Sequence, residues 1–183
     1  DTEVSILLRH WLVANEFNPE FYRVPASRAE FDFKNGKCAI YFVGPDSLKQ
    51  SLQRTDIFRL DVNLFSAKLE VYTNELALNF KGSSAEQLIE TLNKPNTRIG
   101  FLGSISLKAF MQSFDKATPV SLLQIGTGLE MLSRGRLDYF ILPELKVPFP
   151  DKFKKQKSEL SLYGTIIEVP LFIWLDKKLL PHK

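Results

Sequence analysis

The sequence predicts an α/β protein made of two similar α/β lobes joined by two crossing strands. Between residues 98 and 144, short apolar runs alternate with amphipathic stretches in the order strand, helix, strand, helix, strand, which is typical of a parallel sheet. A pattern of strand, capping box, glycine, strand and proline–acid pair occurs twice, once around Gly36 and once around Gly135. Two further strand-like runs, Leu69–Thr73 and Leu162–Val169, lie outside these patterns and would connect the lobes.

The composition limits the possible functions. A chain of 183 residues, 44% of them hydrophobic, can build one ordinary core or two small lobes. A formal charge of +3 is too weak to indicate nucleic-acid binding, which needs a concentrated basic face. No apolar run approaches the length of about 18 residues that a membrane-spanning helix needs. The chain begins at Asp1 without a methionine or an apolar leader, so we expect a mature or trimmed form.

The sequence lacks the usual motifs of metal and cofactor chemistry. Cys38 is the only cysteine, which excludes an internal disulfide and a cysteine-based zinc site. The two histidines, His10 and His182, lie at opposite ends of the chain. No phosphate-binding loop, dinucleotide fingerprint or nucleophile elbow occurs. We therefore predict no metal, no cofactor and no enzymatic activity.

The first part of the chain is expected to form a small α/β unit. Ser27 and Glu30 have the spacing of a capping box, which would start a short helix, and Gly36 would end it. The expected elements are a helix over residues 1–18, a strand over Phe21–Pro25, the short helix, and a strand over Lys37–Val43.

The middle of the chain mixes helical and strand signals. Phe58–Phe65 alternates apolar and polar residues as a half-buried strand does. Ser83 and Glu86 again have capping-box spacing and would start a helix. The remaining expected elements are a polar helix over Asp46–Arg54, a strand over Leu69–Thr73, and a turn or short helix over Asn74–Asn79.

The second part of the chain carries the clearest α/β pattern. Ser104 stands at the N-cap of a helix that follows the strand Arg98–Leu102, and Thr127 with Glu130 would cap the next helix. The other expected elements are strands over Val120–Ile125 and Arg136–Leu142, a helix over Phe153–Leu160, and strands over Leu162–Val169 and Leu171–Leu175.

These elements divide into two lobes. Lobe one would take residues 1–69 plus 169–183, and lobe two would take residues 75–162. Residues 70–74 and 163–168 would be hinge crossings that allow the lobes to move relative to each other. We expect each lobe to have a sheet of its own.

Five segments together resemble a known family. They are Val24–Arg28, Asn35–Ala39, Leu64–Ser66, Arg98–Ser104 and Leu132–Asp138. In order and spacing they are similar to bacterial extracellular solute-binding proteins of the amino-acid-binding type, which have the class II periplasmic-binding-protein fold. The resemblance implies a periplasmic or extracytoplasmic protein that binds a small polar or anionic solute, such as an amino acid or a small carboxylate, in the cleft between its lobes. It implies a membrane transporter or receptor as partner, and no nucleic acid.

The turn from Gly103 to Ser106 is the predicted centre of the binding site. Gly103 allows close approach of the backbone, and the free amides at the start of the following helix favour an anion. In the resembling family an arginine after the first-lobe strand grips the ligand carboxylate; Lys49 stands near that place and offers a point charge. The predicted ligand-binding residues are Arg28, Phe42, Lys49, Gly103, Ser104, Ser106, Thr127 and Glu144, with Phe42 as an aromatic wall.

Simpler and alternative interpretations exist for these residues. Ser104 could merely cap its own helix, and Arg28 and Lys49 could be ordinary surface charges. The same architecture also occurs in ligand-sensing domains of receptors and transcription regulators, and in enzymes. A cleft with clustered carboxylates would favour an enzyme.

Overall fold

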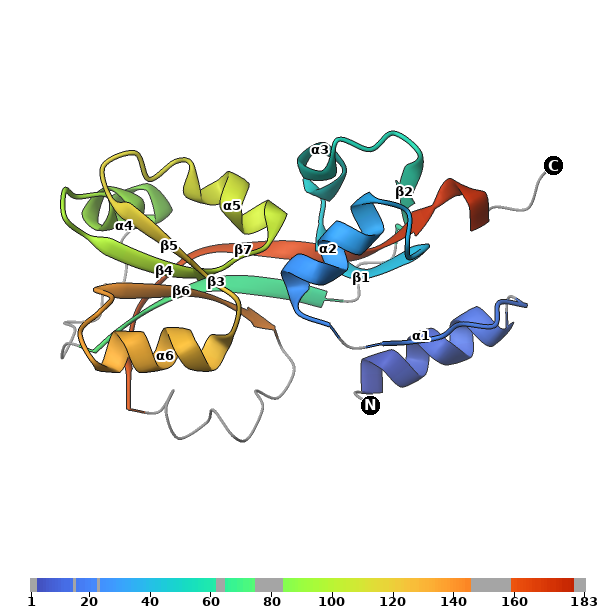
Figure 1. Cartoon of the computed structure of the whole chain (residues 1–183), viewed down its shortest axis with the longest axis horizontal. Helices are drawn as coiled ribbons and strands as arrows, with labels where there is room; N and C mark the ends of the chain where they lie inside the picture. The colour runs from blue at the N-terminus through green and yellow to red at the C-terminus, as the bar shows by residue number, and fades with distance from the viewer. Residues whose placement is uncertain are drawn as a thin grey trace.

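One long strand, β7 (Ser161–Asp176), passes through both halves of the molecule (Figure 1). The computed structural model describes residues 3–14, 16–22, 24–61, 65–74, 84–145 and 159–179. Residues 161–171 of β7 pair antiparallel with β3 (Phe65–Thr73). Residues 171–176 pair with β1 (Ile40–Pro45) and β2 (Ile57–Arg59). Leu171 lies opposite both Phe65 and Pro45, so the partner strand changes at this residue.

Because β7 pairs along its whole length, the described strands form one seven-stranded sheet. Its order is β1-β7-β3-β6-β4-β5, with β2 paired to β7. The expectation of a separate sheet in each lobe is therefore wrong. Two strands were expected over residues 162–169 and 171–175; they are one, because Pro170 lies at a strand position opposite Ser66. The lobe boundaries given above remain a prediction. Below, residues 3–61 and 171–179 are called the first half, and residues 65–145 and 159–170 the second half.

The second half is a sheet covered by helices on both faces. Strand β6 (Tyr139–Leu145) pairs antiparallel with β3 and parallel with β4 (Arg98–Leu102), which pairs parallel with β5 (Thr118–Leu122). Helices α4 (Ala85–Leu92) and α5 (Ile105–Met111) lie on one face, and α6 (Ile125–Ser133) lies on the other (Figure 1). The predicted α/β pattern between residues 98 and 144 is confirmed, with strand ends shifted by a few residues.

Side chains alternate between the two faces of this sheet. Ile99, Phe101 and Ile141 pack under α4 and α5, whereas Phe140 and Leu142 pack under α6. A period of two along each strand places the apolar residues of neighbouring strands on a common face. Both faces are therefore buried, as is usual for the parallel part of such a sheet.

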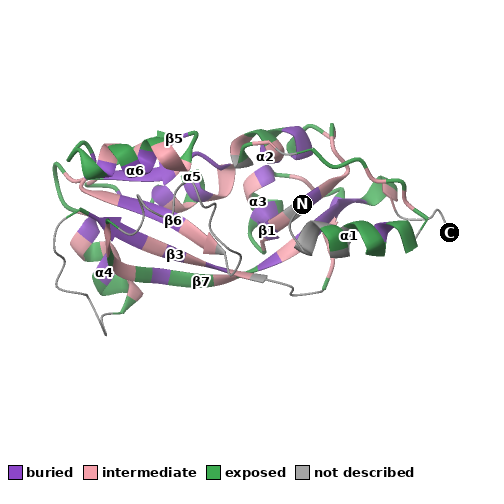
Figure 2. Cartoon of the chain, turned by 90° about the horizontal axis from the view of Figure 1, so that it is seen from below, coloured by how far each residue is buried: buried purple, intermediate pink, exposed green. Residues whose placement is uncertain are grey.

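The first half contains α1 (Glu3–Ala14), α2 (Ala26–Lys34), β1, α3 (Leu48–Leu52), β2 and the short 3₁₀ helix η1 (Lys177–Leu179). Its main apolar cluster consists of Phe33, Tyr41, Leu48, Leu52, Ile57 and Trp174. Helix α1 displays mostly exposed residues (Figure 2), and of its side chains that the structure describes, Leu12 is the buried one. Leu12 packs with Ile173 and Leu175 of β7.

The strand predicted over Phe21–Pro25 is wrong. Residues 18–22, 24 and 25 belong to no helix or strand. Strand β1, the nearest candidate partner, is the last strand at its edge of the described sheet. Without a paired neighbour at hydrogen-bonding distance, an extended segment does not become a strand.

Three predicted capping boxes are misplaced. Helix α2 begins after Pro25 and has no side-chain cap, so Ser27 lies inside its first turn. Helix α4 is capped by Ser84 with Gln87, one residue later than predicted. Helix α6 begins after Gln124, so Thr127 also lies within a first turn rather than at an N-cap. Most of the range Asn74–Asn79 and most of Phe153–Leu160 fall outside the described residues, so these two predictions are not tested.

The predicted repeat is confirmed in part: in both copies a helix, a glycine and a strand follow one another, whereas the capping boxes and the first copy's leading strand are wrong. Helices α2 and α6 each have nine residues and end before a glycine with positive φ, 68° at Gly36 and 66° at Gly135. In both copies the residue after the glycine donates its N–H to a carbonyl of the last helical turn, at 2.8 Å. A left-handed glycine is the usual way to end a helix and redirect the chain.

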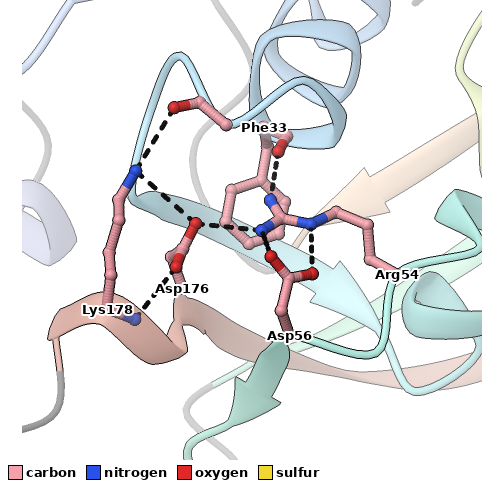
Figure 3. Close-up of polar contacts among 6 residues, drawn as sticks. Phe33, Arg54, Asp56, Asp176 and Lys178 are labelled. Atoms are coloured by element: carbon pink, nitrogen blue, oxygen red, sulfur yellow. Dashed lines mark hydrogen bonds and ion pairs between the residues drawn. The ribbon is translucent and has the colours of Figure 1, made fainter.

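A cluster of hydrogen bonds and ion pairs joins the end of α2, the segment before β2 and the end of β7 (Figure 3). Arg54 donates to the carboxylate of Asp56, to that of Asp176 at 2.9 Å, and to the carbonyl of Phe33 at 2.5 Å. Hydrogen bonds from Arg54 lower the pKa of Asp56 to about 2. Burial alone would raise the pKa of Asp176, but donors from Lys178 and Arg54 outweigh it and hold that pKa below its usual value. We call Arg54, Asp56, Asp176 and Lys178 the Arg54 clamp.

Candidate functional site at the junction of the two halves

The carboxylate of Glu30 lies buried between the two halves. Glu30 belongs to α2 in the first half, and only 2% of its surface is exposed. Its carboxylate accepts hydrogen bonds from the backbone N–H of Ile105 and from the hydroxyl of Ser106, with 3.1 Å between Oγ and Oε1. The hydroxyl of Tyr41, on β1, also donates to it. Donors from both halves therefore converge on one carboxylate, which we call the Glu30 junction.

Local structure at the start of α5 explains why these donors are available. Ser104 caps the helix, since its hydroxyl oxygen accepts from the N–H of Leu107 at 3.1 Å. Gly103 donates its N–H to the carbonyl of Leu122 at 2.8 Å. The first free N–H of the helix is that of Ile105, because the first amides of a helix have no partner within it. The Ser106 hydroxyl lies one residue further on, and both groups point to Glu30.

Burial shifts the pKa values of both titratable groups at the junction, Glu30 and Tyr41. Burial raises the pKa of Glu30, and the hydrogen bonds from Ile105, Ser106 and Tyr41 offset part of that rise. Burial and the nearby Glu30 carboxylate raise the pKa of Tyr41 far above its usual value. Tyr41 therefore remains a neutral hydrogen-bond donor at physiological pH.

Apolar contacts close the junction around these polar groups. Ile105 of the second half packs against the first-half cluster that contains Phe33, Tyr41 and Trp174. Helices α3 and α5, one from each half, lie next to each other. Exclusion of water strengthens the hydrogen bonds to Glu30 and raises the cost of leaving that carboxylate without partners.

Of the residues predicted from sequence, the structure brings Gly103, Ser104 and Ser106 to this junction. Ser106 contacts Glu30 directly, whereas Ser104 serves as a helix cap, which was the simpler interpretation. The other five predicted residues are not at the Glu30 junction, or their side chains are outside the described residues. Arg28, with 56% of its side chain exposed, pairs with Asp32 on its own helix at 2.7 Å.

The remaining four predicted residues lie on four different elements. Lys49 is exposed on α3, and Thr127 is exposed in the first turn of α6. Glu144 is the second-last residue of β6 and lies opposite Lys68 of β3. Phe42 lies in β1 opposite Ile173, and its side chain is outside the described residues.

Sequence reasoning missed Glu30 and Tyr41. Glu30 was assigned to a capping box with Ser27, but its carboxylate faces the other half. A usable signal was present, since Glu30 lies three residues before Phe33, a fully buried residue on the same helix. Residues three apart share a helix face, so Glu30 is an acid on an apolar face, which indicates a buried partner.

The described residues offer no site for a metal ion, since no three His, Cys, Asp or Glu side chains among them cluster suitably. Within the same residues, no helix combines the length and apolar composition required to cross a membrane.

Sequence comparison finds no matching family model and no matching curated protein. Structure comparison finds clear matches. The arginine-bound form of truncated ArgBP from T. maritima aligns with a TM-score of 0.66 and 12% identity, over 95% of this chain and 76% of that chain. The GluR0 ligand-binding core in complex with L-glutamate aligns with a TM-score of 0.66 and 10% identity, over 94% and 75%.

A histidine kinase sensor domain with similarity to periplasmic binding proteins aligns with a TM-score of 0.67 and 12% identity, over 94% of this chain and 71% of that chain. At such identities the likeness concerns the fold. The resemblance inferred from the sequence is confirmed at that level: the chain has the two-lobed class II periplasmic-binding-protein fold.

Proposed function

We propose that this chain binds a small polar or anionic solute at the Glu30 junction, as a periplasmic or extracytoplasmic protein that serves a membrane transporter or receptor. One observation carries the proposal: a carboxylate is already held between the halves by donors from both of them. A solute carboxylate that displaces Glu30 would find the same donors. Binding, rather than catalysis, is the activity that this arrangement supports.

The solutes named for proteins of this fold agree with the chemistry of the junction. ArgBP was solved with arginine and the GluR0 core with L-glutamate, and both solutes are amino acids. We therefore propose an amino acid or a small carboxylate as the solute class. The sensor domain among the structural matches favours a receptor as one possible partner.

Magnitudes show what else the site must supply. A hydrogen bond to a charged group contributes about 1.5–3 kcal/mol, and micromolar affinity needs about 8 kcal/mol. The solute also has to displace Glu30, so its carboxylate gains only the difference between two similar sets of contacts. Entry requires the junction to open, for which β3 and β7 would act as the hinge. Apolar surface buried on closure would provide the rest.

The test is a thermal-shift and calorimetric screen of amino acids and small carboxylates on three proteins: wild type, Glu30→Gln and Ser106→Ala. We expect carboxylates to bind Glu30→Gln more tightly than wild type, because a neutral side chain competes less for the donors. Ser106→Ala should bind them more weakly, because one donor is lost. Glu130→Gln is the control, since Glu130 lies one position further along the equivalent nine-residue helix α6 and pairs with Arg134 at the surface.

Equal affinity of every carboxylate for wild type, Glu30→Gln and Ser106→Ala would place the binding site elsewhere. Failure of all of them to bind Glu30→Gln at millimolar concentration would overturn the proposed function.

A further inference from the structure

We propose that the first half contains a second binding site, for a small amine with an apolar body. The site is a cavity of about 350 Å³ between residues 17–22, helix α2 and the outer edge of β1. This volume falls within the usual range of small-molecule sites, about 300–1,000 Å³. Most of its lining is aromatic or aliphatic, including Phe17, Tyr22, Ile40 and Leu179.

A buried carboxylate oxygen at this cavity lacks a partner. Asp32 lines the cavity and is 6% exposed. Its Oδ2 accepts from Nε of Arg28 at 2.7 Å, whereas its Oδ1 is buried and has no hydrogen-bond partner in the described part of the chain. Buried polar atoms are nearly always hydrogen-bonded, so the unpaired oxygen of this cavity-lining residue indicates a missing donor. A ligand N–H group would supply that donor. Because Oδ1 itself is covered, the Asp32 carboxylate has to turn for a ligand to reach it.

The charges around the cavity favour a cationic donor. Among the lining residues that the structure describes, Asp32 and Glu20 are acidic, and none is Lys, Arg or His. Arg28, the partner of Asp32, has a largely exposed side chain, so solvent weakens its neutralising effect. Burial, and then the Asp32 carboxylate, raise the pKa of the Cys38 thiol, so Cys38 adds no negative charge at neutral pH. An ammonium group near Asp32 with a ring or branched chain among the aromatic residues matches both features.

This site differs from the Glu30 junction in the charge of its ligand and in the side chain that anchors it. Tyr41 is the shared residue, since it lines the cavity and donates to Glu30. Amine binding in the cavity does not depend on the proposed function, because Glu30→Gln should leave amine binding intact. If the cavity bound no amine, carboxylate binding at the Glu30 junction would be unaffected.

Cys38 allows a local test, because it lines the cavity and is the only cysteine. The rate at which a small thiol reagent modifies Cys38 would be measured at mildly alkaline pH with phenethylamine, 2-phenylethanol or 3-phenylpropanoate. We expect phenethylamine to slow modification and to raise the unfolding temperature. The neutral alcohol and the anionic acid should bind at least about tenfold more weakly than the amine, since they do not form the charge-assisted bond to Oδ1.

Three variants separate the site from general effects. Asp32→Asn should remove the preference for the amine over the alcohol, whereas Arg28→Gln should keep it, because this control breaks the same ion pair but leaves the carboxylate. Ala29→Leu, on the cavity wall, should block protection of Cys38 by filling space, and it carries the test if Asp32→Asn does not fold. The proposal would be overturned if the amine and the alcohol protected Cys38 equally. It would also be overturned if Asp32→Asn bound the amine as well as wild type does. Where Asp32→Asn does not fold, undiminished amine binding by Ala29→Leu would have the same meaning.

Discussion

The unit of helix, glycine and strand occurs twice in this chain, and its two copies have different surroundings. In the second half, β6 lies between β3 and β4, with α6 packed on one face. In the first half, β1 has β7 on one side and stands at the edge of the described sheet. The same local structure is therefore central in one half and peripheral in the other.

This difference is visible in what stabilises each half. The ring of Phe140, fully buried, lies against Gly128 of α6, where the absence of a Cβ makes room for the ring. The first half has a smaller core, the Arg54 clamp and a cavity beside β1. Close apolar packing stabilises the second half, whereas the first half depends more on buried polar contacts. Similar local signals therefore do not ensure similar packing.

The largest expected effect tests the dependence of the first half on its clamp. Arg54→Met should lower the free energy of unfolding by about 3–5 kcal/mol, because it leaves Asp176 buried without its guanidinium partner. Urea unfolding measures this. Arg98→Met is the matched control in the second half, because the Arg98–Asp138 pair is exposed and should matter little. Equal losses in the two variants would contradict the contrast between the halves.

The next effect tests the close packing of the second half. A Cβ built at Gly128 would lie 2.7 and 2.8 Å from Cε2 and Cε1 of the Phe140 ring. Gly128→Ala should therefore cost about 1–3 kcal/mol, although alanine is the better helix former. Thermal unfolding measures the loss. In a Phe140→Leu background the smaller side chain should relieve the clash, so simple additivity of the two changes would count against this packing.

A smaller effect compares helix starts in the two halves. Ser84 caps α4, whereas Ser27 lies inside the first turn of α2 and caps nothing. Ser84→Ala should lower the free energy of unfolding by about 1 kcal/mol, and Ser27→Ala should change it much less. A comparable loss at Ser27 would mean that its hydroxyl has a role that α2 does not reveal.

The smallest effect concerns pH. Burial raises the pKa of Glu30 above 4.5, so the folded state holds its proton more tightly than the unfolded chain does. The contribution of Glu30 to stability is therefore complete below about pH 4.5 and is lost as the pH rises through the raised pKa. Glu30→Gln should abolish this decline in a series of urea titrations, and Glu130→Gln should retain it. A decline that persists in Glu30→Gln would assign it to another group.

The opposite sign is expected in the Arg54 clamp. Hydrogen bonds from Arg54 hold the pKa of Asp56 near 2, below its ordinary value of 3.8. Its contribution is present above pH 3.8 and is lost as the pH falls toward 2. The junction and the clamp therefore respond to pH in different ranges.

Features that depend on neighbouring residues could be predicted from the sequence. The left-handed turns at Gly36 and Gly135 follow from the freedom of glycine at positive φ, and the Ser104 cap follows from a hydroxyl next to free helix amides. The parallel unit between residues 98 and 144 follows from apolar periodicity and tight turns. In each case the interacting groups are a few residues apart, so the local sequence contains both.

Partners that lie far apart in the chain could not be predicted, because folding brings them together. The spacing of Ser27 and Glu30 fits a capping box, yet Glu30 binds Ile105 and Ser106, 75 and 76 residues further along the chain. The segment over Phe21–Pro25 has strand-like residues, but no described strand lies beside it. The physical reason is common to both: a carboxylate or an extended backbone binds whichever donors the folded chain leaves free, and those donors come from the other half or from a neighbouring strand.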